Sequence, residues 1–259
     1  METKILCVGD VVGPGAVDFV SARLKSLRNS LNADCVILNG ENAASGNGLD
    51  IASANALLNA GADIVTGGNH TWKRREIREY LAVSERVIRP ANYPPGTPGF
   101  GYTFTGCGGF RLLVINLLGL VYMDPMDCPF RAADAILRRE KGNFDLCVVD
   151  FHAEATSEKA ALAYYLDGRV SAVFGTHTHV ATADERILPK GTGFITDIGM
   201  TGPADSILGI RSDIIVDKFT RRLPVKFDTA QGGIVLCGIL LTLDCETGLC
   251  TAIERVRAE

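Results

Sequence analysis

Short apolar runs alternate with amphipathic segments along the first third of the chain. The apolar runs lie at residues 4–8, 35–38 and 64–66, and the segments with a helical spacing of apolar residues lie at 15–31, 50–60 and 73–82. Each run ends in glycine and polar residues before the next amphipathic segment begins. Strand, polar tip and helix, repeated three times, is the pattern of a parallel sheet with crossover helices. Such open sheets hold their ligands at the carboxyl ends of the strands.

The pattern changes after residue 93, where a loop rich in proline and glycine begins. Apolar stretches at 101–104 and 111–117, joined by a glycine-rich turn, predict an antiparallel hairpin. Later strand-like runs lie at 146–149, 170–174, 193–198, 233–243 and 251–256, and we expect helices at 129–140, from Ser157 and at 212–222. Late hairpins after an early series of strands and helices predict a second sheet packed on the first. We expect one α/β domain over residues 1–259, in which 93–128 and 200–225 could line the cleft or an interface.

Composition narrows the class of protein. Hydrophobic residues make up 47% of the 259 residues and charged residues 22%, as in ordinary globular proteins. A net charge of −4 gives no electrostatic basis for binding duplex nucleic acid. No uninterrupted apolar run approaches ~20 residues, so we expect no membrane span. The first strand begins almost at Met1, which leaves no room for a signal peptide.

The eight cysteines do not have the spacing of a disulfide framework or a zinc site, because no C-x-x-C pair occurs. Cys7, Cys35, Cys147 and Cys237 lie inside apolar runs, where a free cysteine behaves as a small hydrophobic residue. We therefore expect reduced thiols and a cytoplasmic location.

Polar clusters at the strand ends include all four histidines of the chain. The clusters are Asp10, Glu41 with Asn42, Asn69 with His70, His152, and His177 with His179. Side chains at the carboxyl ends of parallel strands can meet even when they are far apart in sequence. Carboxylates, amide oxygens and imidazoles together suit Fe, Mn or Zn better than Ca, and one carboxylate can bridge two ions. The clusters therefore predict a metal centre at the edge of the sheet.

Each residue alone also has a plainer interpretation. Asp10 at a strand end could be only a turn former or a helix cap, and His152 could be a buried histidine with satisfied hydrogen bonds. We interpret Asn39, Asn47 and Asp50 as turn or cap residues.

The pair His177 and His179 is the strongest single indication of a metal. The two residues follow the apolar run 170–174 and are two positions apart. In extended backbone both rings would face the same side, with Cα atoms roughly 6–7 Å apart. That spacing allows two imidazoles on one ion, or one imidazole on each of two ions. A bridging Glu41 favours the second arrangement.

Taken in order, these motifs resemble the motif blocks of the calcineurin-like metallophosphoesterases, and most closely those of the YmdB-type bacterial subgroup. The blocks are Gly-Asp-Val-Val-Gly at 9–13, Gly-Glu-Asn-Ala-Ala at 40–44, Gly-Asn-His-Thr-Trp at 68–72, Asp-Phe-His-Ala-Glu-Ala-Thr-Ser-Glu-Lys at 150–159 and Gly-Thr-His-Thr-His at 175–179. The resemblance covers essentially the whole chain. It implies two packed mixed β-sheets flanked by helices, an α/β/β/α sandwich.

The resemblance also implies a role for each site residue. Asp10, Asn42 and His179 would hold a first metal ion, Asn69, His152 and His177 a second, and Glu41 would bridge both. His70 would stay uncoordinated and act as the acid beside the leaving group. Val12 stands where the wider superfamily has an imidazole, with Asn42 as the substitute, and Glu41 stands where an aspartate usually bridges. Lys73 stands where the subgroup commonly has an acidic residue.

The activity implied by the resemblance is metal-dependent hydrolysis of phosphoric diesters. Two divalent or mixed-valence ions, Fe or Mn with Zn as an alternative, would activate a hydroxide that attacks phosphorus. The expected substrates are small cyclic nucleotides, 2′,3′-cyclic and also 3′,5′-cyclic nucleoside monophosphates. The alternatives are a metal- or nucleotide-binding regulator without turnover, and a protein phosphatase or nuclease that uses the same centre. Homo-oligomerisation stays open.

Overall fold

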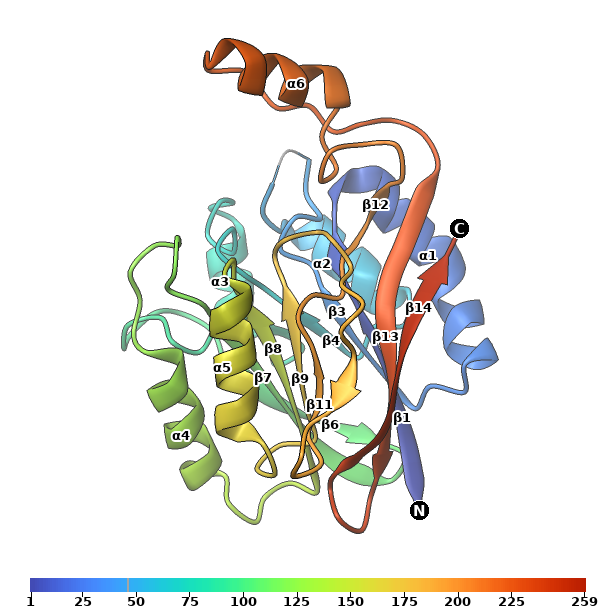
Figure 1. Cartoon of the computed structure of the whole chain (residues 1–259), viewed down its shortest axis with the longest axis vertical. Coiled ribbons are helices and arrows are strands. Elements are labelled where there is room, and N and C mark those ends of the chain that lie inside the picture. Colours follow the sequence, from blue (N-terminus) through green and yellow to red (C-terminus); the bar gives the residue numbers. More distant parts are fainter. Residues whose placement is uncertain (46) are drawn as a thin grey trace.

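Two β-sheets stacked face to face form the centre of the computed structural model, which describes residues 1–45 and 47–259 (Figure 1). The strands of the first sheet are β1 (Glu2–Val8), β2 (Asp10–Val11), β3 (Cys35–Asn39), β4 (Ile64–Thr66), β5 (Val87–Ile88), β12 (Met200–Pro203), β13 (Ile234–Asp244) and β14 (Cys250–Ala258). Their order is β2-β12-β13-β1-β3-β4-β5, with β14 paired to β13. Strands β1, β3, β4 and β5 run parallel, whereas β13 is antiparallel to its neighbours.

The second sheet is built from the middle of the chain. Its strands are β6 (Tyr102–Cys107), β7 (Phe110–Leu118), β8 (Leu146–His152), β9 (Ala172–Thr176), β10 (Arg186–Ile187) and β11 (Gly193–Ile195). Their order is β10-β11-β9-β8-β7-β6, with parallel pairing from β7 to β11 and antiparallel pairing at both edges. The carboxyl ends of β3 and β8 meet across the two sheets, where Asn39 donates a hydrogen bond to Asp150.

Helices cover the outer faces of both sheets. These covering helices are α1 (Gly13–Ser30), α2 (Ile51–Asn59), α3 (Ile77–Val83), α4 (Pro129–Arg139) and α5 (Thr156–Leu166), and a further helix is α6 (Ser212–Arg221). Figure 1 shows α4 and α5 along one side of the body, α1 along the other, and α6 standing apart from it. Asp50 caps α2 as predicted, because its side chain accepts the N–H of Ser53. No helix in the described part of the chain is both long and apolar enough to cross a membrane.

Alternate side chains of the inner strands point to opposite faces, and both faces are buried. In β1, Leu6 and Val8 join the core beneath α1 and α2, while Ile5 and Cys7 join the core between the sheets. A third core, which includes Phe151, lies between the second sheet and the helices α4 and α5. Strands buried on both faces appear as nearly continuous apolar runs, which explains why the sequence indicates them so clearly.

The architecture confirms the predicted α/β/β/α sandwich of two mixed sheets. The hairpin of β6 and β7 lies in the second sheet as expected, but the last hairpin, β13 and β14, joins the first sheet. That part of the prediction was wrong because β13 pairs with β1 from near the opposite end of the chain, which local patterning cannot reveal. The helix expected over 73–82 begins only at Ile77. All eight cysteines are free.

Candidate metal centre

The residues predicted for the site meet at the carboxyl ends of the two sheets. The first sheet supplies Asp10 in β2, Glu41 and Asn42 after β3, and Asn69 and His70 after β4, while the second supplies His152 at the end of β8 and His177 and His179 after β9. A continuous series of side-chain and backbone contacts joins all of them. The structure therefore brings together every side chain that the sequence singled out, while the role of each stays a prediction.

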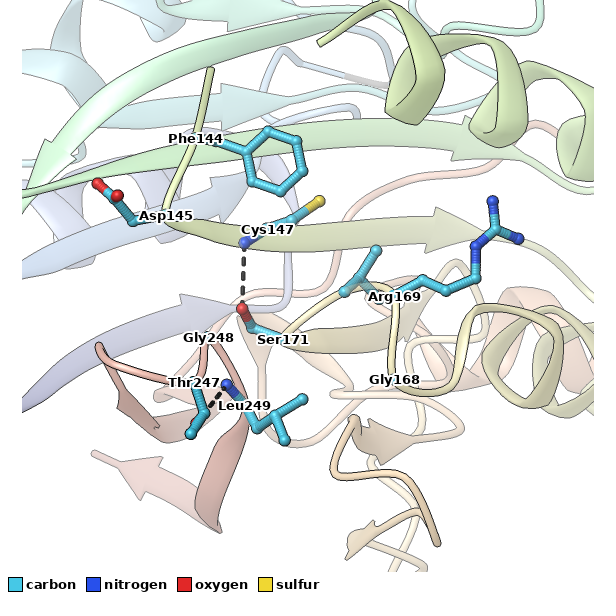
Figure 2. Close-up of a pocket in the computed structure, with 10 residues that line it drawn as sticks. Phe144, Asp145, Cys147, Gly168, Arg169, Ser171, Thr247, Gly248 and Leu249 are labelled. Carbon is cyan, nitrogen blue, oxygen red and sulfur yellow. Dashed lines mark hydrogen bonds between the residues drawn. The ribbon is translucent and has the colours of Figure 1, made fainter. Parts of the chain in front are cut away.

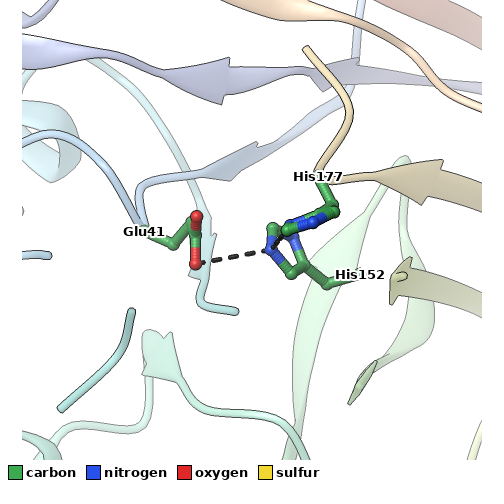
Figure 3. Close-up of side chains that lie close together, drawn as sticks. All are labelled: Glu41, His152 and His177. Atoms are coloured by element: carbon green, nitrogen blue, oxygen red, sulfur yellow. Dashed lines mark hydrogen bonds and ion pairs between the residues drawn. The ribbon is translucent and has the colours of Figure 1, made fainter. Parts of the chain in front are cut away.

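The residues predicted for the second ion form the tightest group, which we call the second-ion side. It consists of Glu41, Asn69, His152 and His177. His152 Nε2 lies 3.4 Å from Glu41 Oε2 and 3.1 Å from His177 Nδ1. Asn69 Oδ1 lies 3.0 Å from His152 Nε2. One ligand atom from each of Glu41, His152 and His177 lies within 4.8 Å of the other two (Figure 3). These atoms could hold a single ion.

The imidazoles of His177 and His179 each have one nitrogen held by an acceptor outside the centre. His177 Nε2 lies 3.0 Å from Glu154 Oε2, and His179 Nδ1 lies 3.0 Å from the carbonyl oxygen of Leu208. Because each acceptor needs a proton, the donating nitrogen points away and the lone pair of the other nitrogen points into the centre. A neutral imidazole with its lone pair turned inward is the form that binds a metal.

Burial controls the charges of the centre. It lowers the pKa of His152 to about 3, and it lowers the pKa of His177 as well. Burial raises the pKa of Asp10 well above its usual range, and the charges of Glu41 and Asp197 raise it further. A buried carboxylate surrounded by other carboxylates and neutral imidazoles lacks a positive partner. A cation at this place would neutralise that charge.

Further observations show that the residues fit a metal ion. Asp10 Oδ1 is buried and has no hydrogen-bond partner among the described residues. Gly68 leaves room beside the ligands, because a Cβ at this position would clash with Glu41 Oε2 and would lie 2.5 Å from His152 Nε2. The donor set of carboxylate, amide and imidazole atoms suits Fe, Mn or Zn. The centre is therefore chemically suited to a divalent first-row ion.

The residues predicted for the first ion are arranged differently, and we call them the first-ion side. It consists of Asp10, Asn42 and His179. The amide nitrogen of Asn42 donates to Glu41 Oε1 at 2.6 Å and lies 3.3 Å from His179 Nε2. Its amide oxygen lies 2.8 Å from His70 Nδ1. A ligand role for Asn42 would require the amide to turn over, so that its oxygen faces the ion.

Val12 lies next to the first-ion side and is almost fully buried. Its backbone pairs with that of Asn42 in an isolated bridge. A Cβ on Gly209 would lie 2.6 Å from Val12 Cγ1, so the Val12 side chain is packed closely against the 204–210 loop. Asn42 is thus adjacent to the position where the resemblance leads us to expect an imidazole.

Both segments that could line the cleft touch site residues through their backbones. Leu208, in the 200–225 segment, accepts the hydrogen bond from His179. Gly119, in the 93–128 segment, donates its N–H to the carbonyl oxygen of His152 at 2.9 Å. Whether either segment contacts a substrate stays a prediction.

The extended backbone expected for His177 and His179 was wrong. Strand β9 ends at Thr176, and the two histidines have φ angles of 102° and 64°. Such conformations cost about 1–3 kcal/mol each and persist only where the surroundings hold them. Asp10 accepts the N–H of His177 at 3.1 Å, and Asp197 accepts the N–H of the residue between the histidines at 3.0 Å. The turn directs the two rings to different sides of the centre, one to each.

His70 lies against the Glu41 carboxylate. Its Nδ1 is 3.1 Å from Glu41 Oε1 and 2.8 Å from Asn42 Oδ1, so Nδ1 carries a proton. Its backbone N–H also donates to Glu41 Oε2 at 2.9 Å. In the described part of the chain no hydrogen bond engages His70 Nε2, and the side chain is 28% exposed. Nε2 is therefore the nitrogen of this partly exposed ring that is left for a ligand.

Sequence reasoning missed a buried network behind the centre. Asp150, in β8, accepts hydrogen bonds from Asn39, Thr66 and Thr176. Burial raises the pKa of Asp150 to about 6, although these hydrogen bonds act to lower it. Asn39, which we interpreted as a turn residue, also accepts the N–H of Glu41 at 3.1 Å. The signal in the sequence was a charged residue inside an otherwise apolar strand, because such residues are rarely buried without partners.

A small pocket of about 130 Å³ lies at the opposite, amino-terminal ends of β8 and β9 (Figure 2). Its wall includes the backbone N–H of Cys147, which donates to the hydroxyl of Ser171 at 3.1 Å. Burial raises the pKa of the Cys147 thiol, and the guanidinium of Arg169 is paired with Asp134 at 2.6 Å. The Cys147 thiol is therefore unreactive, and the Arg169 guanidinium already has a carboxylate partner. The metal centre remains the candidate functional site.

Comparisons with known proteins find matches that cover nearly the whole chain. A family model described as YmdB-like protein matches residues 6–256. A Bacillus subtilis protein named 2′,3′-cyclic-nucleotide 2′-phosphodiesterase is 47% identical over 253 residues, which cover 98% of this chain and 96% of that protein. A crystal structure of a hypothetical protein from Thermus thermophilus has a TM-score of 0.92 at 46% identity and covers 99% of each chain. A crystal structure of a novel phosphatase from Mycoplasma pneumoniae has a TM-score of 0.93 at 32% identity, covering 100% of this chain and 94% of that one.

Proposed function

The chain belongs to the YmdB-like family, as its motif blocks predict, and from this premise we propose that it hydrolyses 2′,3′-cyclic nucleotides at a centre of two metal ions. Hydrolysis of phosphoric diesters agrees with the name of the Bacillus subtilis relative. The observation that carries the metal dependence is the convergence of Glu41, His152 and His177 within 4.8 Å. Cyclic 3′,5′-nucleotides are further candidate substrates, because the bond to be broken has the same chemistry.

The assignment of ligands follows the two sides of the centre. Asn69, His152 and His177 would hold one ion, Asp10, Asn42 and His179 the other, and Glu41 would contact both. When bound, the ions would lower the pKa of a water towards about 7 and would neutralise charge on phosphoryl oxygens. We propose Fe or Mn as the resident metal and Zn as the alternative, because this donor set accepts all three.

The protein's own contribution to proton transfer would come from His70. A hydrogen bond from its Nδ1 to Glu41 fixes the plane of the ring. This leaves Nε2 without a hydrogen-bond partner among the described residues, so that it can carry a proton to the departing alkoxide of the ribose. The step requires a protonated imidazole beforehand. A general acid at this point spares the leaving oxygen from departing as a free alkoxide.

The test combines metal content with turnover. Freshly purified protein is subjected to elemental analysis, and after reconstitution with Mn²⁺ or Fe²⁺ it is assayed on 2′,3′-cAMP, 3′,5′-cAMP, a phosphopeptide and single-stranded RNA. We expect about two ions per chain, the number in two-metal hydrolytic sites, and fastest turnover of 2′,3′-cAMP. Two bound ions without turnover of any diester would overturn the enzymatic proposal and favour a regulator. Preferred hydrolysis of the phosphopeptide or the RNA would reassign the substrate.

A further inference from the structure

We propose that Asp150 is a positioning residue that acts through Thr176 to fix the tautomer of His152, so that His152 Nε2 presents its lone pair to the second-ion side. The effect on the ring can be observed in the metal-free protein. Only its consequence for metal binding rests on the proposed function.

Asp150 lies at the junction of the two sheets and is completely buried. Its Oδ1 accepts one hydrogen bond, from the hydroxyl of Thr176 at 2.7 Å. Its Oδ2 accepts two, from the amide of Asn39 at 3.0 Å and from the hydroxyl of Thr66. Since an ionised carboxylate can only accept, the hydroxyl proton of Thr176 must point towards Asp150.

The direction of the Thr176 hydroxyl proton decides which tautomer His152 adopts. Thr176 Oγ1 lies 2.9 Å from His152 Nδ1. The hydroxyl has one hydrogen and has already donated it, so it can only accept from the ring. Nδ1 therefore carries the ring proton, and Nε2 is left with a lone pair that faces Asn69 Oδ1 at 3.0 Å and Glu41 Oε2 at 3.4 Å. Acceptors facing each other at these distances repel unless a cation lies between them.

The same carboxylate also positions the bridging residue. The amide nitrogen of Asn39 donates to Asp150, and the amide oxygen of Asn39 accepts the N–H of Glu41 at 3.1 Å. One buried charge thus orients a ligand from each sheet. This gives a role to the Asp150 carboxylate, which contacts none of the predicted metal ligands directly but accepts hydrogen bonds from Asn39, Thr66 and Thr176.

The substitution Asp150→Asn keeps the shape of the side chain but replaces one acceptor oxygen by a donor NH2 group. The new amide group must place its nitrogen towards one of the two former oxygen positions. On the Oδ2 side it would meet two donors, whereas on the Oδ1 side it would meet only Thr176. The nitrogen should therefore face Thr176, whose hydroxyl then accepts from it and donates to His152 Nδ1. The ring proton would move to Nε2, and the lone pair would no longer face the ion, as happens when the aspartate of a serine-protease triad is changed to asparagine.

The experiment is a long-range ¹H–¹⁵N spectrum of metal-free protein labelled on histidine, recorded at slightly alkaline pH. With four histidines in the chain, each ring can be assigned. We expect His152 as the Nδ1–H tautomer in the unsubstituted protein and as the Nε2–H tautomer in Asp150→Asn. The matched control is Thr66→Val, which removes a donor from the same carboxylate without reversing its polarity, and it should keep the Nδ1–H tautomer.

Metal titration supplies the second measurement. Affinity for the second ion should fall about 10- to 100-fold in Asp150→Asn, the usual effect of losing a group that orients a histidine ligand. If this variant does not fold, Thr176→Val answers the same question, because the ring should then lose its preference for Nδ1–H. An unchanged His152 tautomer in a folded Asp150→Asn or Thr176→Val protein would overturn the proposal. A changed tautomer with unchanged metal affinity would overturn the link to the metal, and neither result depends on which nucleotide is hydrolysed.

Discussion

The two sides of the metal centre differ in how completely the protein prepares them. On the second-ion side, His152 is fully buried and candidate ligand atoms of three residues already converge. On the first-ion side, the Asn42 amide presents its nitrogen to Glu41, and Val12 replaces an expected imidazole. Preorganised ligands lose less conformational freedom when an ion binds. We therefore infer that the second ion binds more tightly and that the first depends on a local rearrangement.

The largest effect should come from Glu41, the residue predicted to bridge the two ions. Glu41→Gln keeps the shape of the side chain but removes its charge, so neither ion retains its common anionic ligand. We expect loss of both ions and a fall in turnover greater than about 100-fold, the upper end for groups that only support a ligand. Elemental analysis and steady-state hydrolysis of 2′,3′-cAMP measure the two effects.

The matched control for this change is Glu158→Gln. The Glu158 carboxylate accepts the N–H of Leu120 at 2.9 Å and lies outside the group of predicted ligands. The control should keep both ions. Two ions retained in Glu41→Gln would show that this carboxylate is not the bridge, and the comparison of the two sides would then lose its common element.

His70 should affect the chemistry while leaving both sides intact. His70→Ala removes the proposed general acid, and loss of a general acid typically lowers turnover about 100- to 10,000-fold. The metal content should stay at the level of the unsubstituted protein, because no predicted ligand is removed. Turnover and elemental analysis on the same preparation check this. If the ions are lost together with activity, His70 supports the ligands rather than the leaving group.

The contrast between the two sides also marks what the sequence could predict. Residues such as Glu41 and His152 were predictable because each lies within two residues of the end of a strand, and parallel strands bring such ends together. The network of Asn39 and Asp150 was not, because their contact depends on how one sheet is placed on the other. The left-handed turn at His177 also depends on distant partners, since Asp10 accepts its backbone N–H. Short-range patterning identifies strands and their tips, whereas pairing across sheets requires the folded structure.

A smaller effect, confined to the second-ion side, is expected from Glu154. Its carboxylate lies 3.0 Å from His177 Nε2 and keeps that ring oriented, although it is 48% exposed. In Glu154→Gln the amide oxygen can still accept the hydrogen bond, so affinity for the second ion should fall only about 10-fold, the lower end for such partners. Competition with a metal chelator measures the affinities of both ions separately. An equal loss at both ions would mean that the sides are coupled more strongly than their contacts indicate.

The smallest effect should come from restoring an imidazole to the first-ion side. Val12 is packed against Gly209 so closely that a Cβ on that glycine would lie 2.6 Å from Val12 Cγ1, and the Val12 Cβ lies 3.3 Å from the place of a Cβ on Gly202. The larger ring of Val12→His should therefore force the 204–210 loop away, at a cost of about 1–3 kcal/mol in the free energy of unfolding. Urea denaturation of the metal-free protein measures this cost. Because the same loop carries the Leu208 carbonyl that orients His179, its displacement should weaken the first ion even though a potential ligand has been added. A variant of unchanged stability that binds the first ion more tightly would show instead that this side is loose enough to accept a further ligand without repacking.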